Sequence, residues 1–137
     1  MKRASRSGGG FVAVELSASI ALLLLPVAML VVSLPTWSGR EHAATVIARE
    51  TARLSAQRWP ASADDEINEL VSELATNFGV DTADVVVTMS ARVDRGEQMQ
   101  ATVTIRMPAI SVPGFGTVGQ WHWTTTSAAL IDSYRSR

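Results

Sequence analysis

Residues 11–34 read FVAVELSASIALLLLPVAMLVVSL, a run of apolar and small residues that carries a single charge, Glu15. A helix of this length rises about 36 Å at 1.5 Å per residue, which exceeds the roughly 30 Å thickness of a bilayer's hydrocarbon core. A cleaved secretory signal has a shorter apolar region followed by a small-residue cleavage site, and the following PTWSGR at residues 35–40 offers no such site. The segment therefore predicts a transmembrane helix over residues 11–34.

The residues before this span are polar and basic. The leader MKRASRSGGG, residues 1–10, contains Lys2, Arg3 and Arg6, and basic residues beside a span favour the cytoplasmic side. We therefore expect a single-pass membrane protein with a cytoplasmic N-terminus and an extracytoplasmic C-terminal domain in the cell envelope or a pilus. Trp37, just beyond the span, fits an anchor at the level of the lipid headgroups.

Glu15 is the most informative residue of the span. An acidic side chain inside a membrane segment costs about 2.5–3.5 kcal/mol on insertion scales, so it is a functional-site candidate by default. Glu15 lies four residues after Phe11, and Phe11 directly follows Gly10. The alternative is a plain signal anchor with an incidental glutamate, which does not explain why the acid lies where insertion is costly.

The basic leader, the Gly10–Phe11 junction, Glu15 and the long apolar helix together resemble the class III signal of type IV prepilins. The resemblance implies that prepilin peptidase cleaves after Gly10 and that the new amino terminus, at Phe11, is methylated. It further implies that Glu15 pairs with the Phe11 amine of a neighbouring subunit. An amine and a carboxylate, each unfavourable in lipid, neutralise each other only when two subunits are in register, which makes Glu15 an assembly residue.

Within the prepilins, the chain resembles the TadE-type pseudopilins of the tight-adherence (Flp) pilus. The resemblance rests on Val14-Glu15-Leu16, on the leucine run 22–25 followed by Pro26, and on the alanine- and arginine-rich stretch 43–53. Major Flp pilins end soon after the apolar helix and usually carry an aromatic residue after the glutamate. This chain has Leu16 there and a full ectodomain, so it resembles a minor component.

The resemblance implies a non-enzymatic pseudopilin, or minor pilin, that acts in assembly of a Tad/Flp-type pilus for adhesion or secretion. The implied partners are the membrane, prepilin peptidase, other pilins and pseudopilins, and the pilus assembly platform. Two alternatives stay open: a pseudopilin of a type II secretion or competence system, and a signal-anchored envelope protein with a ligand-binding ectodomain. Removal of the leader after Gly10 separates the last alternative from the other two.

Two further features of the span concern helix packing. Ala13, Ser17 and Ala21 form a row of small residues four apart, which lets helices approach closely in lipid; the alternative is that small residues are simply common in an alanine-rich chain. Pro26 removes one backbone hydrogen bond. It either kinks the span or is a tolerated membrane proline.

Composition excludes several functions for the remainder. The chain has no cysteine, which rules out disulfides, thiolate catalysis and cysteine metal sites. From Pro35 onward acids outnumber bases by 12 to 9, whereas nucleic-acid binding needs a basic patch. His42 and His122 lie far apart without an accompanying carboxylate pattern, so we expect no metal site. No P-loop or G-x-S-x-G motif is present and GFG at 114–116 is a plain loop tip, so we expect no catalytic residue and no cofactor.

Two helices are expected after the span. Residues 38–58 form a helical stretch, with a kink or break before it at Leu34-Pro35 because a residue preceding proline is pushed away from helical geometry. Ser62 offers an N-cap for a second helix, with Asp65 three residues on, and Gly79 is its natural stop. Five apolar residues follow the cap at helical spacing: Ile67, Leu70, Val71, Leu74 and Phe78.

Two groups of side chains in this part allow a functional or a structural interpretation. Five acids suggest paired carboxylates, but helix-start electrostatics and a solvated face explain them: Asp64, Asp65, Glu66, Glu69 and Glu73. Trp121 and Trp123 share one face of an expected strand, where they form either a binding face or part of a core or subunit interface.

Strands follow the second helix. Residues 85–93 and 99–107 alternate apolar and polar side chains on either side of DRGE at 94–97, which predicts a β-hairpin with one buried face. Residues 108–119 are expected to form a loop and residues 120–131 a third strand. A helix over 63–78 can cover the apolar face of this sheet, which gives a small α+β domain.

The expected organisation has four parts: a leader at 1–10, a transmembrane helix at 11–34, a helical stalk at 35–60 and an α+β domain at 61–137.

Overall fold

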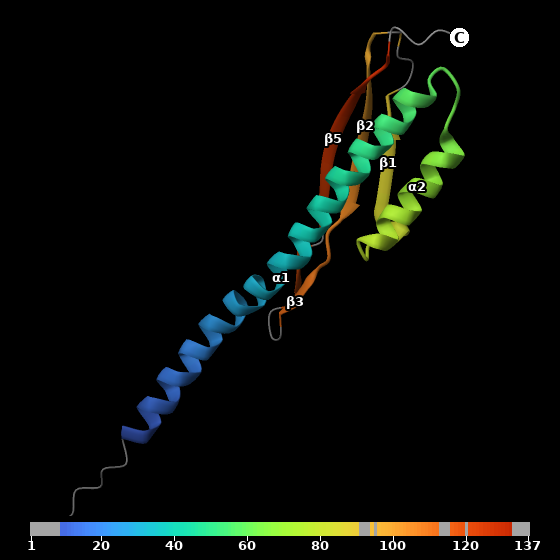
Figure 1. Cartoon of the computed structure of the whole chain (residues 1–137). Coiled ribbons are helices and arrows are strands. Elements are labelled where there is room, and N and C mark those ends of the chain that lie inside the picture. Colours follow the sequence, from blue (N-terminus) through green and yellow to red (C-terminus); the bar gives the residue numbers. More distant parts are fainter. Residues whose placement is uncertain (1–8, 91–93, 95, 113–115, 120, 133–137) are drawn as a thin grey trace, which may run out of the picture. The chain divides into compact units, whose positions relative to one another are not determined.

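The computed structural model describes residues 9–90, 94, 96–112, 116–119 and 121–132. The expectations for the basic leader, for Ala91 to Val93 at the end of the first strand, for the loop tip at 114–115, for Gln120 and for the polar tail after Asp132 lie outside the described residues. The chain is α+β, as expected, with a long N-terminal apolar helix, a second helix and a small antiparallel sheet (Figure 1).

The first helix, α1, extends from Gly9 to Arg58 without interruption. Of the kink or break expected at Leu34-Pro35, the break is absent and a kink stays a prediction. A proline inside a helix removes one backbone hydrogen bond and costs about 3 kcal/mol, and α1 nevertheless continues through Pro35. Pro26 also lies within α1.

The chain divides into two units, one of Met1–Leu34 with Ile110–Val118, the other of Pro35–Ala109 with Gly119–Arg137. The first unit holds the apolar half of α1 and a short hairpin of β3 (Ile110–Val112) and β4 (Gly116–Val118), in which Ile110 lies opposite Val118. The loop expected over 108–119 thus contains two short strands. Their β-branched residues favour pairing, and Gly116 adopts a φ of 88° that suits glycine.

The second unit contains a three-stranded antiparallel sheet in the order β1-β2-β5. Its strands are β1 (Val85–Met89), β2 (Gln98–Arg106) and β5 (His122–Leu130). Val87 lies opposite Val103, which in turn lies opposite Thr125. The predicted hairpin and third strand are confirmed. The alternation is confirmed as well, since Ala101, Val103 and Ile105 are fully buried.

The buried face of the sheet packs against two helices, the second half of α1 and α2 (Asp64–Asn77), which Figure 1 shows beside the strands. The core cluster draws on both helices and the sheet: Ala43, Ala44, Ile47, Ala48, Ala75, Val80, Val103 and Ile105. The helical stalk expected at 35–60 is therefore part of the same unit as residues 61–109 and 119–137. Alanines with short side chains let α1 lie close to the sheet, and the sequence pattern alone did not distinguish this from an exposed alanine-rich rod.

Helix α2 ends as expected but begins differently. Gly79 has a φ of 65°. The N–H groups of Gly79 and Val80 donate to the carbonyls of Thr76 and Ala75 at 3.0 and 2.8 Å, the bond pattern of a Schellman motif. The N-cap position is Ala63 without a side-chain cap, so the capping role expected for Ser62 is wrong.

The hydroxyl of Ser62 instead donates to the Asp64 carboxylate at 2.6 Å. A charged carboxylate oxygen two residues away is a strong hydrogen-bond acceptor.

Candidate functional site

Large apolar side chains of the first half of α1 are exposed. Leu23 and Val32 are 72% and 77% exposed, and within the described residues no other segment covers the span. Its helix is long and apolar enough to cross a membrane. So much exposed aliphatic surface is stable only against lipid or against other apolar helices.

The predicted processing site, Gly10 and Phe11, lies in the first turn of α1, which starts at Gly9. A glycine within a helix costs about 1 kcal/mol relative to alanine. Gly9 and Gly10 therefore make this end of the described helix easier to unwind than the part that follows. The Gly10–Phe11 peptide bond can enter a protease cleft in extended form at small energetic cost.

The side chain of Glu15 is exposed on the apolar helix. The hydroxyl of Ser19 donates to the backbone carbonyl of Glu15 at 2.9 Å, so it does not neutralise the carboxylate. Among the described residues no basic group pairs with Glu15. An uncompensated carboxylate is costly in lipid.

Ala13, Ser17 and Ala21 lie on one side of α1, since each step of four residues turns the helix by about 40°. The Ser17 hydroxyl donates to the carbonyl of Ala13 at 2.8 Å. The row therefore offers a neighbouring helix small side chains but no unused hydroxyl hydrogen. Glu15 lies about 160° around the helix from Ser17. A single neighbouring helix cannot contact the small row and Glu15 at once, so each of them would contact a different neighbouring helix.

In the second unit, Arg40 and Arg106 surround Asp84. Arg40 Nη1 donates to Asp84 Oδ2 at 3.0 Å and to the Arg106 carbonyl at 2.5 Å. Arg106 Nη1 lies 4.0 Å from Asp84 Oδ1. This group joins α1 to the start of β1 and the end of β2. Sequence analysis missed it because residues 40, 84 and 106 share no local pattern.

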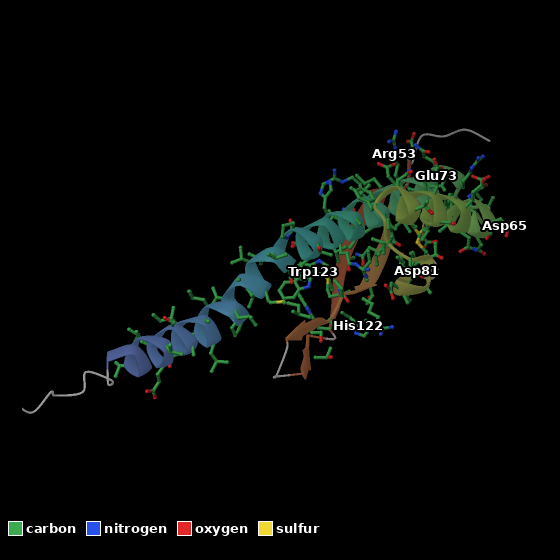
Figure 2. The ribbon with its side chains drawn as sticks, turned by 90° about the horizontal axis from the view of Figure 1, so that it is seen from below. Arg53, Asp65, Glu73, Asp81, His122 and Trp123 are labelled. Atoms are coloured by element: carbon green, nitrogen blue, oxygen red, sulfur yellow. The ribbon has the colours of Figure 1, made fainter. Side chains whose placement is uncertain are left out.

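The two histidines are not brought together. The His42 ring lies edge-on to Phe78 with centroids 5.8 Å apart, whereas His122 lies on the exposed face of the sheet (Figure 2). Within the described parts of the chain, no three His, Asp or Glu side chains are grouped so as to hold a metal ion.

The acids of α2 lie on the outer surface of the helical layer, where Figure 2 labels Asp65 and Glu73. Glu66 pairs with Arg58 at 2.8 Å. This pair links the end of α1 to the first turn of α2, and the observed geometry fits the electrostatic interpretation of the acids.

Three tryptophans form a cluster that the sequence did not reveal. Trp121 packs edge-on against both Trp37 and Trp123, with ring centroids 6.0 Å apart in each pair. The Trp37 indole N–H donates to the Pro108 carbonyl at 3.3 Å. Trp123 packs against the core cluster, whereas Trp121 is 38% exposed. Trp121 was expected to share a strand face with Trp123, but it lies directly before β5 and contacts the Trp123 ring from there. The contact of Trp121 with Trp37 of α1 could not be read from the sequence.

Comparison of the chain with models of protein families, with curated proteins and with solved structures finds no match. The functional assignment therefore rests on the residues described above.

Proposed function

We propose that this chain is a non-enzymatic pseudopilin of the TadE type, a minor component of a tight-adherence (Flp) pilus. The observation that carries the proposal is the lone carboxylate of Glu15 on an otherwise apolar, uncovered helix. It lies four residues after Phe11, which directly follows Gly10. An unpaired acid in a span is costly, and a partner amine at the processed end of a neighbouring chain removes that cost.

The first step of this function is cleavage between Gly10 and Phe11 by prepilin peptidase. Cleavage removes the basic leader and converts the Phe11 nitrogen into a terminal amine. The glycines before this bond favour access, because glycine weakens a helix relative to alanine.

The second step is assembly through the apolar helices. The Phe11 amine of one subunit pairs with Glu15 of the next, and the row of Ala13, Ser17 and Ala21 packs against a further helix. Because the row and Glu15 lie on nearly opposite sides of α1, each subunit contacts at least two neighbours. A bundle or a filament provides two such neighbours. A simple pair of helices would leave either Glu15 or the small row without a contact.

Processing is tested by N-terminal sequencing of the protein from its native host. Wild type should start at Phe11, and Gly10→Val should keep the leader, because the peptidase subsite admits only a small residue there. Gly8→Val, two residues upstream, serves as the matched control and should still be cleaved. A mature start at any other residue would refute the prepilin assignment and favour the plain signal anchor.

Assembly is tested by Glu15→Val and Glu15→Asp. Glu15→Val should insert and be cleaved, since an apolar residue enters the membrane more readily, but its incorporation into pili and its cross-linking to other pilins should fall. Glu15→Asp should lie between, because the charge is kept on a shorter side chain. If cleaved Glu15→Val assembles as well as wild type, Glu15 is not the assembly residue.

A further inference from the structure

The tryptophan cluster, defined as Trp37, Trp121 and Trp123, joins a residue of α1 to two residues at the start of β5 or directly before it. Two of its rings have a packing role. Trp37 donates its N–H to Pro108, and Trp123 packs against the core. Trp121 differs, since it is 38% exposed, and no hydrogen bond of its indole N–H is found within the described residues. An exposed aromatic ring held in place by two others needs an explanation beyond domain stability.

Chain connectivity fixes where this cluster can lie. Trp37 is three residues beyond Leu34, the end of the apolar segment. Both residues lie in the uninterrupted helix α1, so three residues correspond to a rise of about 4.5 Å. The Trp121 ring centroid is 6.0 Å from that of Trp37. A headgroup layer is about 5–8 Å thick on each side of the hydrocarbon core, so a span ending at Leu34 holds the cluster at or just outside this layer.

We propose that Trp121, supported by Trp37 and Trp123, seats the second unit on the lipid headgroup layer. Indole has an apolar body and a polar N–H, and tryptophan is enriched at membrane–water boundaries for that reason. A lone Trp37 would anchor only the helix, whereas Trp121 belongs to the sheet region and anchors the folded unit. The inference rests on the membrane-spanning part of the proposed function and does not depend on pilus assembly.

The test uses the full chain in liposomes that contain phospholipids brominated near the glycerol backbone, which quench only tryptophans at that depth. Trp121→Phe should lose about half of the quenched emission, because Trp37 remains at the boundary. Trp59→Phe is the matched control. Trp59 follows the end of α1, about 33 Å along the helix from Trp37, so its replacement should leave the quenched component unchanged. Both variants keep an aromatic ring, and circular dichroism checks that each is folded.

Flotation of the liposomes tests membrane anchoring of the chain separately from the contact of Trp121 with the headgroup layer. One outcome is that the protein floats with the liposomes while Trp121→Phe and Trp59→Phe lose equal amounts of quenched emission. That result would overturn the contact of Trp121 with the headgroup layer but not the membrane anchor. Protein that fails to float would overturn the membrane anchor and the inference with it. Unchanged quenching together with weaker subunit cross-linking in Trp121→Phe would assign the ring to a neighbouring subunit and overturn the lipid contact.

Discussion

Removal of residues 35–60 should unfold the second unit, because this segment supplies one side of its core. The comparison is between two fragments that both lack the span, residues 35–137 and residues 61–137. Only the longer fragment retains the part of α1 that contains Ala43, Ala44, Ile47, Ala48 and Ala52, all fully buried. The shorter fragment keeps α2 and the sheet but exposes the buried faces of β2 that α1 covers.

The magnitude follows from these buried side chains. Burial of an isoleucine contributes about 1.5–3 kcal/mol and each methyl-sized group about 0.8 kcal/mol. Ile47 and the four alanines together therefore contribute about 5–6 kcal/mol. The total stability of a domain of this size is about 5–15 kcal/mol, so the loss removes much or all of it.

Circular dichroism and urea titration provide the assay. The longer fragment should show mixed α and β signal and a cooperative transition, and the shorter one should show none. Ile47→Ala in the longer fragment should lower the free energy of unfolding by about 2–5 kcal/mol. Arg49→Ala, two residues away on the exposed side of α1, should change it by no more than about 0.5 kcal/mol. A cooperative transition in residues 61–137 would refute the assignment of α1 to the core.

Three further predictions concern local features. Gly79→Ala should destabilise the longer fragment by about 1–2 kcal/mol, because the φ of 65° at this position strains an L-residue. Gly39→Ala, within α1 and with open space around the added Cβ, should stabilise the same fragment by about 0.5–1 kcal/mol. The same urea titration measures both. Asp84→Asn should cost about 1–2 kcal/mol, with a smaller difference from wild type at high salt, and exposed Glu69→Gln should be neutral. Ser17→Leu should leave cleavage after Gly10 intact but lower cross-linking between subunits, because a large side chain keeps helices apart; cross-linking equal to wild type would remove the role of the small row.

The part of the candidate site that lies in one continuous stretch of sequence could be predicted from the sequence. Gly10, Phe11 and Glu15 lie within six consecutive residues of one helix, so their relation follows from chain order and helical rise. The structure adds that Glu15 has no basic partner within the described chain and lies almost opposite the small row. The Arg40–Asp84–Arg106 group and the tryptophan cluster could not be predicted, because each joins residues from distant segments.

The sequence by itself determined the elements whose signal is periodic and local. The apolar run predicted a span. Alternation in residues 85–93 and 99–107 predicted the paired strands that the structure shows at Val85–Met89 and Gln98–Arg106. Gly79 ends α2 because only a residue without Cβ adopts its conformation easily. Tertiary structure decided what these elements pack against. Residues 35–60 had the pattern of a separate stalk, yet the alanine face of this part of α1 packs against the sheet. Close packing depends on the shapes of two surfaces together, and a one-dimensional pattern records only one of them at a time.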